Sequence, residues 1–252
     1  LNINILKKNQ NYDVNGTINN SERTFNPENL LKLANLKIDL LSNKKIKVQS
    51  NNSFKLKLDN NLKVKEYNLN SNLNFDKIFF DNSFQNLIYL KNGRIISNFS
   101  NKSYNLKIDT AYDFLNENYN NHEDNTLNLE ITKDKDIKVK SLFKNNKTKI
   151  NTSEFTKYFK DYESFIKNQD IIISSDSIVN FLIDKKNNIQ DLNISSNLSF
   201  DKLNIDYISK KIKKRVPEYK NKIFLIGNNI IVNHTKDFSK ILSSGKYALT
   251  DK

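Results

Sequence analysis

Few residues of this chain have types and spacings that could support chemistry. The two histidines are His122 and His234, and His122 lies beside the acidic residues Glu117, Glu123 and Asp124. This cluster could hold a cation, but its Asn-rich surroundings favour a solvated loop. His234 directly follows an apolar stretch, which favours a surface position at a strand end. Neither histidine is therefore predicted to be a ligand.

Other catalytic patterns are missing from the sequence. It contains no Cys, which excludes disulfides, thiolate metal sites and a Cys nucleophile. It has no phosphate loop, no nucleophile elbow and no zinc-binding helix motif. Asp76 and Asp201 occur in similar contexts and could meet as paired carboxylates, but Asp-Lys after a strand is more typical of a turn. We therefore expect no enzyme, no cofactor and no metal site.

Composition bounds the class of protein. The chain has 252 residues, 37% hydrophobic residues and a net charge of +13. Leu, Ile, Val and Phe make up about 31%, well above the roughly 20% below which disorder is expected. No apolar run approaches the 18 or more residues of a membrane helix, and no signal peptide opens the chain. Because the chain begins with Leu1 and lacks Met, we expect an internal fragment of a longer protein.

The basic charge comes from 38 Lys and only three Arg. A nucleic-acid site would favour Arg, whose planar guanidinium suits phosphates and guanine edges. The Lys residues here are spread along the chain and mostly alternate with apolar residues, and Lys, Asn and Ile share AT-rich codons. Solvated strand faces are therefore the favoured interpretation. Anionic lipid headgroups are the second alternative, and no nucleic-acid partner is expected.

Alternation of apolar and polar residues is the dominant pattern. Successive side chains of a strand point to opposite faces, so this period of two predicts strands with one apolar and one wet face. Ser196 falls in phase with the longest of these runs. The apolar positions that we expect to form a common lining are Phe54, Leu56, Leu58, Leu106, Ile108, Leu127, Leu129, Val139, Leu192, Ile194, Leu198 and Phe200.

Asn pairs and a few helical patterns separate the strands. Asn tolerates the left-handed conformation of turns, and Gly is rare here. Turns are therefore predicted at Asn60-Asn61, Asn145-Asn146, Asn187-Asn188 and Asn228-Asn229. Short helices are predicted after Asn26-Pro27, over 153–168 as an aromatic stripe, over 207–215 as a basic segment ended by Pro217, and around Phe238 to Leu242 with Gly245 as a cap.

The sequence also contains an internal repeat. Residues 71–78 match residues 196–203 at an offset of 125, and residues 88–96 resemble residues 223–231 at an offset of 135. The second copy thus holds about ten extra residues, which include the basic helix. We expect one continuous β-rich array over 1–252, with approximate repeat units 54–150 and 178–252 and the helix 153–168 between them.

These features resemble a known family. One-sided strands, the duplicated Ser-Asn-Leu-x-Phe-Asp-Lys blocks and the Tyr-x-Val-x-Gly-x-Ile pattern at Tyr12 to Ile18, interpreted as an Asn-Gly turn, are similar to AsmA-like proteins of Gram-negative envelopes. The nearest likeness is to the YhdP branch, with TamB more distant. The resemblance implies a periplasmic protein, anchored in the inner membrane by a segment outside this chain. It also implies a lengthwise trough that carries phospholipid acyl chains towards the outer membrane.

The expected fold is mostly β: an elongated antiparallel sheet of repeated hairpin units, curled into an open apolar groove, with a few short helices. A sheet with one apolar face must bury that face on a second sheet, on helices or on a ligand. The expected function is non-enzymatic lipid binding and conduction, in which the groove gives lipid tails a uniform apolar lining. The alternatives are a structural or adhesive β-array with a sealed core and, less favoured, a piece of an outer-membrane barrel.

Overall fold

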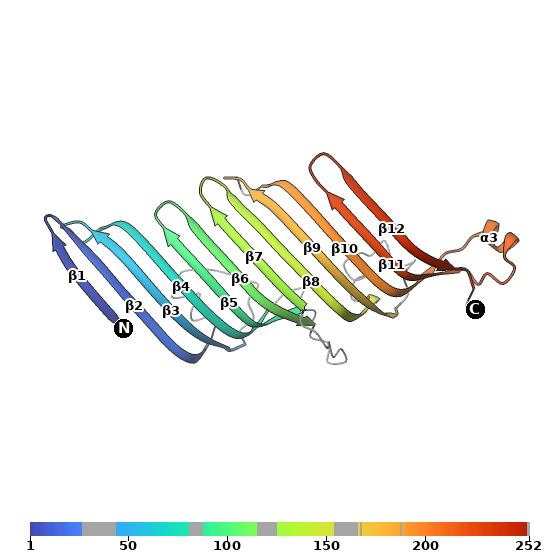
Figure 1. The fold of residues 1–252 in the computed structure, drawn as a ribbon, viewed down its shortest axis with the longest axis horizontal. Helices are drawn as coiled ribbons and strands as arrows, with labels where there is room; N and C mark the ends of the chain where they lie inside the picture. The colour runs from blue at the N-terminus through green and yellow to red at the C-terminus, as the bar shows by residue number, and fades with distance from the viewer. Residues whose placement is uncertain are drawn as a thin grey trace. The chain divides into compact units, whose positions relative to one another are not determined.

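The protein is mostly β, and its strands form one antiparallel sheet. In the computed structural model the twelve strands are hydrogen-bonded in chain order, from β1 to β12 (Figure 1). β1 and β12 are the two edge strands, so the sheet is not closed into a barrel. The structure describes residues 1–26, 44–80, 88–114, 125–153, 166, 168–186 and 188–250. The elements are β1 (Asn2–Lys8), β2 (Asn11–Phe25), β3 (Ile46–Leu58), β4 (Val64–Phe79), β5 (Ile88–Ser100), β6 (Tyr104–Phe114), β7 (Asn125–Lys133), β8 (Ile137–Asn151), β9 (Asp170–Ile183), β10 (Ile189–Asp206), α3 (Lys210–Arg215), β11 (Lys222–His234) and β12 (Ser239–Ala248).

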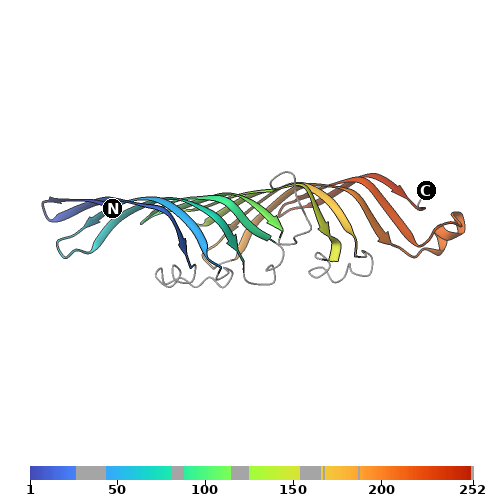
Figure 2. The ribbon, with the colours of Figure 1, turned by 90° about the horizontal axis from the view of Figure 1, so that it is seen from below.

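The chain divides into two compact units. The first comprises Leu1–Leu115, Thr126–Leu142 and Asn180–Leu192. The second comprises Asn116–Asn125, Phe143–Val179 and Asn193–Lys252. Within the first unit the blue and cyan strands bend along their length (Figure 2).

The predicted alternation is confirmed in β3 and β10, whereas the edge strands β1 and β12 are largely exposed on both faces. In β3, Ile46 and Val48 are buried, whereas Lys47 and Gln49 are exposed. Residues directly opposite each other on antiparallel strands share a face, so the register extends this division to the neighbouring strands. We call the face that carries Ile46 and Val48 the core face, and the opposite one the polar face.

Five residues of the first unit form its buried centre, which we call the core cluster. Phe75 is only 4% exposed, and its ring lies over Gly93 of β5. A Cβ atom at position 93 would overlap that ring, so the close approach depends on Gly93. Partly buried side chains, among them Leu73 and Ile95, pack against the cluster. The core cluster consists of Ile46, Val48, Phe75, Leu90 and Tyr112.

The two similar sequence blocks adopt the same strand pairing. The first block lies in β4 and pairs with β5, and the second lies in β10 and pairs with β11. Residues that match in sequence between the two copies also occupy equivalent positions in the strand pairing. The equivalent pairs are Leu73 with Ile95 and Leu198 with Ile230, followed by Phe75 with Gly93 and Phe200 with Asn228.

A bulge recurs at the equivalent place in both copies. The register of β5 against β6 shifts between Lys91 and Arg94, and that of β11 against β12 shifts between Ile226 and Asn229. Each shift contains one residue in the left-handed conformation. In the first copy this residue is Asn92, with φ 50°, and in the second it is Gly227, with φ 57°. Asn and Gly tolerate this conformation better than other residues, so both copies can bend their ladder at this point.

The basic insertion also lies where the sequence places it. The helix predicted over 207–215 is confirmed as α3, between β10 and β11, although it begins three residues later. The predicted helix after Asn26-Pro27 and nearly all of the one over 153–168 lie outside the described residues.

The helix predicted around Phe238 to Leu242 is wrong. This segment is the edge strand β12, in which Ile241 pairs with Val232 and Leu242 with Ile231 of β11. Both faces of this strand are largely exposed, and adjacent apolar residues there obscured the period of two.

Several predicted turns are also wrong. Gly16 lies inside β2 and not in a turn. A glycine fits there because the ring of Phe54 on β3 occupies the space that a side chain at position 16 would fill. Asn145-Asn146 lies inside β8 and Asn228-Asn229 inside β11, where left-handed residues bend a strand without ending it. The turn at Asn60-Asn61 is confirmed, and the carboxylate of Asp59 accepts hydrogen bonds from backbone N–H groups in it.

The core cluster predicts a large stability difference between two phenylalanines of the first unit. Phe75→Ala should lower the free energy of unfolding by about 3–5 kcal/mol, because it removes a buried ring and leaves a cavity. Phe99→Ala, at a 40% exposed position of β5, should cost far less. Urea unfolding followed by circular dichroism checks both variants. Equal losses would contradict the assignment of Phe75 to the core.

Tyr112 predicts a loss of stability at alkaline pH. Burial raises the pKa of Tyr112 to about 12, from about 10 in the unfolded chain. The neutral phenol is therefore favoured in the folded state, and its contribution is complete below pH about 10 and is lost as the pH rises towards about 12. Urea midpoints measured across this range should fall less steeply for Tyr112→Phe than for the native protein. Identical slopes would contradict this origin.

Candidate functional site

A row of apolar residues crosses six strands on the core face of the first unit. Each residue of the row stands directly opposite the next, so all of them share one face. Gly16 leaves room for the Phe54 ring, and the rings of Phe99 and Tyr104 lie 5.9 Å apart. From β1 to β6 the row is Ile3, Gly16, Phe54, Leu69, Phe99 and Tyr104.

Two shorter rows continue this surface towards the β1–β2 and β3–β4 turns. We call the three rows together the open patch, because large apolar side chains in it are exposed to solvent, among them Ile5, Val64 and Leu69. Among the described residues, ten apolar side chains are buried and twenty-two large ones are exposed, so exposure of this kind is the rule in this protein. The shorter rows are Ile5, Val14, Leu56 and Tyr67, and then Tyr12, Leu58 and Val64.

A band of small polar residues separates the open patch from the core cluster. Asn52 donates hydrogen bonds to the Ser50 hydroxyl at 3.0 Å and to the Ile18 carbonyl at 3.1 Å, and it accepts one from Ser71 at 2.6 Å. These groups satisfy part of one another's hydrogen-bonding capacity, which lowers the cost of placing them on the core face. The lining is therefore not uniformly apolar. The polar band consists of Asn20, Ser50, Asn52, Ser71 and Ser97.

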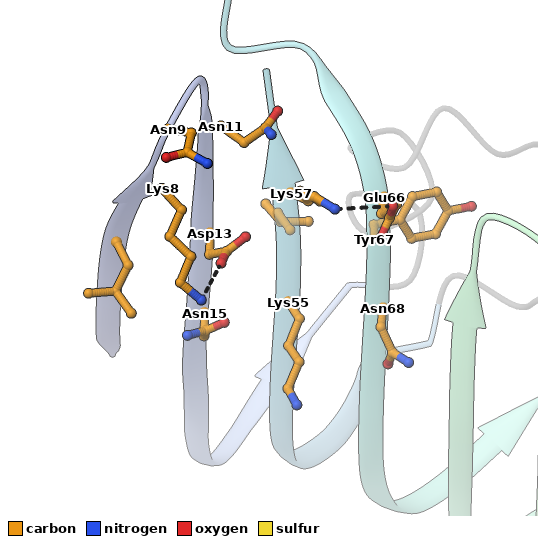
Figure 3. Close-up of a pocket in the computed structure, with 12 residues that line it drawn as sticks. Lys8, Asn9, Asn11, Asp13, Asn15, Lys55, Lys57, Glu66, Tyr67 and Asn68 are labelled. Carbon is orange, nitrogen blue, oxygen red and sulfur yellow. Dashed lines mark ion pairs between the residues drawn. The ribbon is translucent and has the colours of Figure 1, made fainter. Parts of the chain in front are cut away.

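The opposite face at the same end of the unit is charged. A shallow depression of about 730 Å³ lies there, between the β1–β2 turn and strands β3 and β4 (Figure 3). Lys8 is 3.2 Å from Asp13, and Lys57 is 3.5 Å from Glu66, so both carboxylates are ion-paired. Asn side chains continue the polar face across β4 and β5, where Asn98 donates to Asn70. The two faces thus differ sharply in chemistry.

The second unit also carries polar groups among its buried residues. Thr148 donates a hydrogen bond to Asn125 at 2.9 Å, and both side chains are fully buried. The hydroxyls of Ser177 and Ser196 are 2.6 Å apart. Small hydroxyl and amide groups therefore interrupt the apolar positions in both units.

The twelve residues predicted as a common lining occupy different surroundings. Phe54, Leu56 and Leu58 lie together in the open patch. Leu127 instead packs against the core cluster, and Phe200 is buried in the second unit. The other seven residues are half-buried on their strands. They are Leu106 and Ile108 on β6, Leu129 on β7, Val139 on β8, and Leu192, Ile194 and Leu198 on β10.

Sequence reasoning missed the polar band and part of the open patch. Ser50 and Asn52 continue the alternation of Val48 and Phe54, as Ser196 does in its own run. In-phase Ser and Asn residues were therefore the available signal. Ile3 and Ile5 were also missed, although they alternate with Asn in the same way.

The structure describes the positions of three of the residues considered for chemistry, Asp76, Asp201 and His234. Asp76 lies within β4 and not at a turn, and its carboxylate accepts hydrogen bonds from the N–H groups of Lys47 and Lys77. Asp201 likewise lies within β10. His234 ends β11, with its Nδ1 2.7 Å from the Ser239 hydroxyl. The acidic cluster around His122 lies outside the described residues.

Within the described ranges, no group of three or more His, Asp or Glu residues is placed to hold a metal ion. In that same part of the chain, no helix has the length and apolar character needed to cross a membrane.

No family model matches the chain, and no curated protein or solved structure matches it either.

The polar band predicts a difference between two adjacent asparagines of β3. Asn52→Leu should lower the free energy of unfolding by about 1–3 kcal/mol, because it leaves the Ile18 carbonyl and the Ser50 and Ser71 hydroxyls without this partner. Asn51→Leu, on the exposed polar face, is the matched control and should change it by about 0.5 kcal/mol or less. Urea unfolding measures both. A neutral Asn52→Leu variant would show that the band is dispensable.

Proposed function

We propose that this chain is a non-enzymatic lipid-binding and lipid-conducting segment of an AsmA-like protein. In this proposal it supports phospholipid transport between the inner and outer membranes and thereby envelope integrity. The chain lies in the periplasm and is anchored to the inner membrane by a segment outside it. Its ligands are phospholipid acyl chains, and it uses no cofactor and no nucleic acid.

The observation that carries the proposal is the exposed apolar surface of the open patch. Exposed apolar patches of this kind are typical of interaction sites, because water contact with them is unfavourable. The patch crosses six strands, and strands are about 4.8 Å apart, so it extends about 24 Å across the strands. One leaflet of a bilayer core is about 15 Å thick, so an acyl chain laid across the strands would fit.

Energetics favour tails over a polar ligand. Each buried methylene contributes about 0.8 kcal/mol, so a chain that covers the patch is held without any specific polar contact. The polar band offers the hydroxyl and amide groups of Ser50, Asn52 and Ser71 at the border of the patch. In the proposal the acyl chains bind on the open-patch side of this band and do not cross it. The apolar surface that they contact is therefore narrower than the groove predicted from the sequence.

A structural or adhesive β-repeat with a sealed core is the second candidate. The core cluster favours it, because five large side chains are buried there among other side chains of the protein. Under this alternative the open patch would be covered by protein and would hold no lipid.

Lipid occupancy tests the proposal with two matched variants of β5. Phe99 and Ile96 are 40% and 38% exposed, and their pairing with Leu69 and Asn72 places them on opposite faces. Phe99→Asp should lower the bound phospholipid at least about fivefold, because a carboxylate next to acyl chains must be desolvated. Ile96→Asp, on the polar face, should leave the occupancy unchanged.

The measurement is native mass spectrometry with lipid extraction, on the 252-residue chain purified from a bacterial host. Circular dichroism first establishes that both variants are folded. A folded native protein without stoichiometric phospholipid would support the structural β-repeat. Equal lipid loss in both variants would contradict binding at the open patch.

A further inference from the structure

The α3 segment, residues 207–221, contains the extra residues that distinguish the second copy of the repeat from the first. The two copies share their register on both sides of this point, so the insertion was added without disturbing the sheet. α3 lies beyond the ends of β10 and β11, the two strands that it joins (Figure 1). The strand pairing is therefore the same in the copy with α3 as in the copy without these extra residues.

The segment is firmly attached to the end of the sheet. Tyr219 is almost fully buried, and its hydroxyl donates a hydrogen bond to the Tyr207 carbonyl. The N–H of Tyr207 donates to the Asn221 carbonyl at 2.9 Å, which closes the base of the segment. Ser209 caps the helix by accepting a hydrogen bond from the N–H of Ile212. The segment thus presents its outer side chains from a fixed base.

Five of the six residues of α3 are basic, and all five are exposed. None forms an ion pair with a carboxylate in the described part of the chain. The helix dipole disfavours Lys210 and Lys211 in the first turn and favours the basic residues of the last turn. Lys214 follows Lys210 by four residues, so these two like charges repel each other. The arrangement becomes favourable next to a negatively charged surface. The five basic residues are Lys210, Lys211, Lys213, Lys214 and Arg215.

Two exposed apolar side chains adjoin these charges. Ile208 is 82% exposed, and Tyr207 is 46% exposed. Apolar side chains beside a basic cluster are typical of segments that lie in a membrane interface, where the apolar groups enter the headgroup region and the cations meet anionic lipids. A phosphate backbone of nucleic acid would satisfy the charges but offers no comparable environment for Ile208.

We propose that the α3 segment docks on a membrane surface rich in anionic phospholipid. Lys210, Lys211, Lys213 and Lys214 contact the headgroup phosphates, and Ile208 enters the interface beside them. This contact holds the ends of β10 and β11 against the headgroups. It is independent of lipid binding at the open patch, which belongs to the first unit.

Vesicle co-sedimentation of the 252-residue chain tests this proposal at about 0.1 M salt, where long-range charge effects are partly screened. Binding to phosphatidylcholine vesicles with about 30% phosphatidylglycerol should be at least about tenfold tighter than to pure phosphatidylcholine. The variant Lys210→Gln/Lys211→Gln/Lys213→Gln/Lys214→Gln should lose at least about tenfold of that affinity. Gln keeps the helix propensity, so folding is preserved.

A matched control removes the same charge from exposed strand and turn positions. It carries Lys135→Gln, Lys138→Gln, Lys140→Gln and Lys144→Gln, and it should keep its affinity for the anionic vesicles within about threefold. Equal losses in the two quadruple variants would overturn the proposal, since binding would then follow net charge alone. Absence of any preference for phosphatidylglycerol would overturn it as well.

Three single variants separate the remaining outcomes. Ile208→Ser should weaken vesicle binding several-fold. If this variant binds vesicles like the native protein and the chain binds single-stranded RNA tightly, α3 is a nucleic-acid site and the proposal fails. Phe99→Asp detects any contribution of the open patch to vesicle binding, and Ile96→Asp on the polar face of β5 should bind the vesicles like the native protein. A loss of vesicle binding in Phe99→Asp would instead assign the membrane contact to the open patch.

Discussion

The protein depends on one constraint, which is that a single sheet can satisfy its backbone but cannot by itself cover its side chains. Every interior strand pairs with two neighbours, so the backbone donors and acceptors are used within the sheet. Apolar side chains on the core face need contact from another layer. In the first unit the side chains of the core cluster are buried among their apolar neighbours, whereas the open patch, with exposed Leu69 and Phe99, is not covered by described residues. Phospholipid tails are the occupant that we propose for this surface.

The recurring bulge and the polar band affect two different properties of the sheet, the register of its strands and the border between its buried and exposed side chains. Asn92 and Gly227 place a left-handed residue at the same point of two repeats, so each ladder changes register while the strands continue. On the core face, Asn52 and its hydroxyl partners separate a buried region from an exposed one. The same sheet thereby combines a protein core with a surface that we propose for ligand.

Alternation predicted many of the strands because it depends on backbone geometry, and the structure adds that the two similar sequence blocks have equivalent strand pairing. Local signals failed where the deciding contact comes from a neighbouring strand. Gly16 resembled a turn residue, but the Phe54 ring on the next strand explains it. Ile241 resembled part of a helix, but pairing with β11 makes it a strand residue. The open patch could be predicted only in part, because exposure depends on which positions other segments cover.

Site-specific photo-crosslinking tests the central proposal most directly. p-Benzoylphenylalanine in place of Phe99 would point from the core face, and in place of Ile96 it would point from the polar face of the same strand. After irradiation of the protein in bacterial cells, the account predicts phospholipid attached at position 99 and little or none at position 96. Equal labelling at the two positions, or no lipid at position 99, would contradict it.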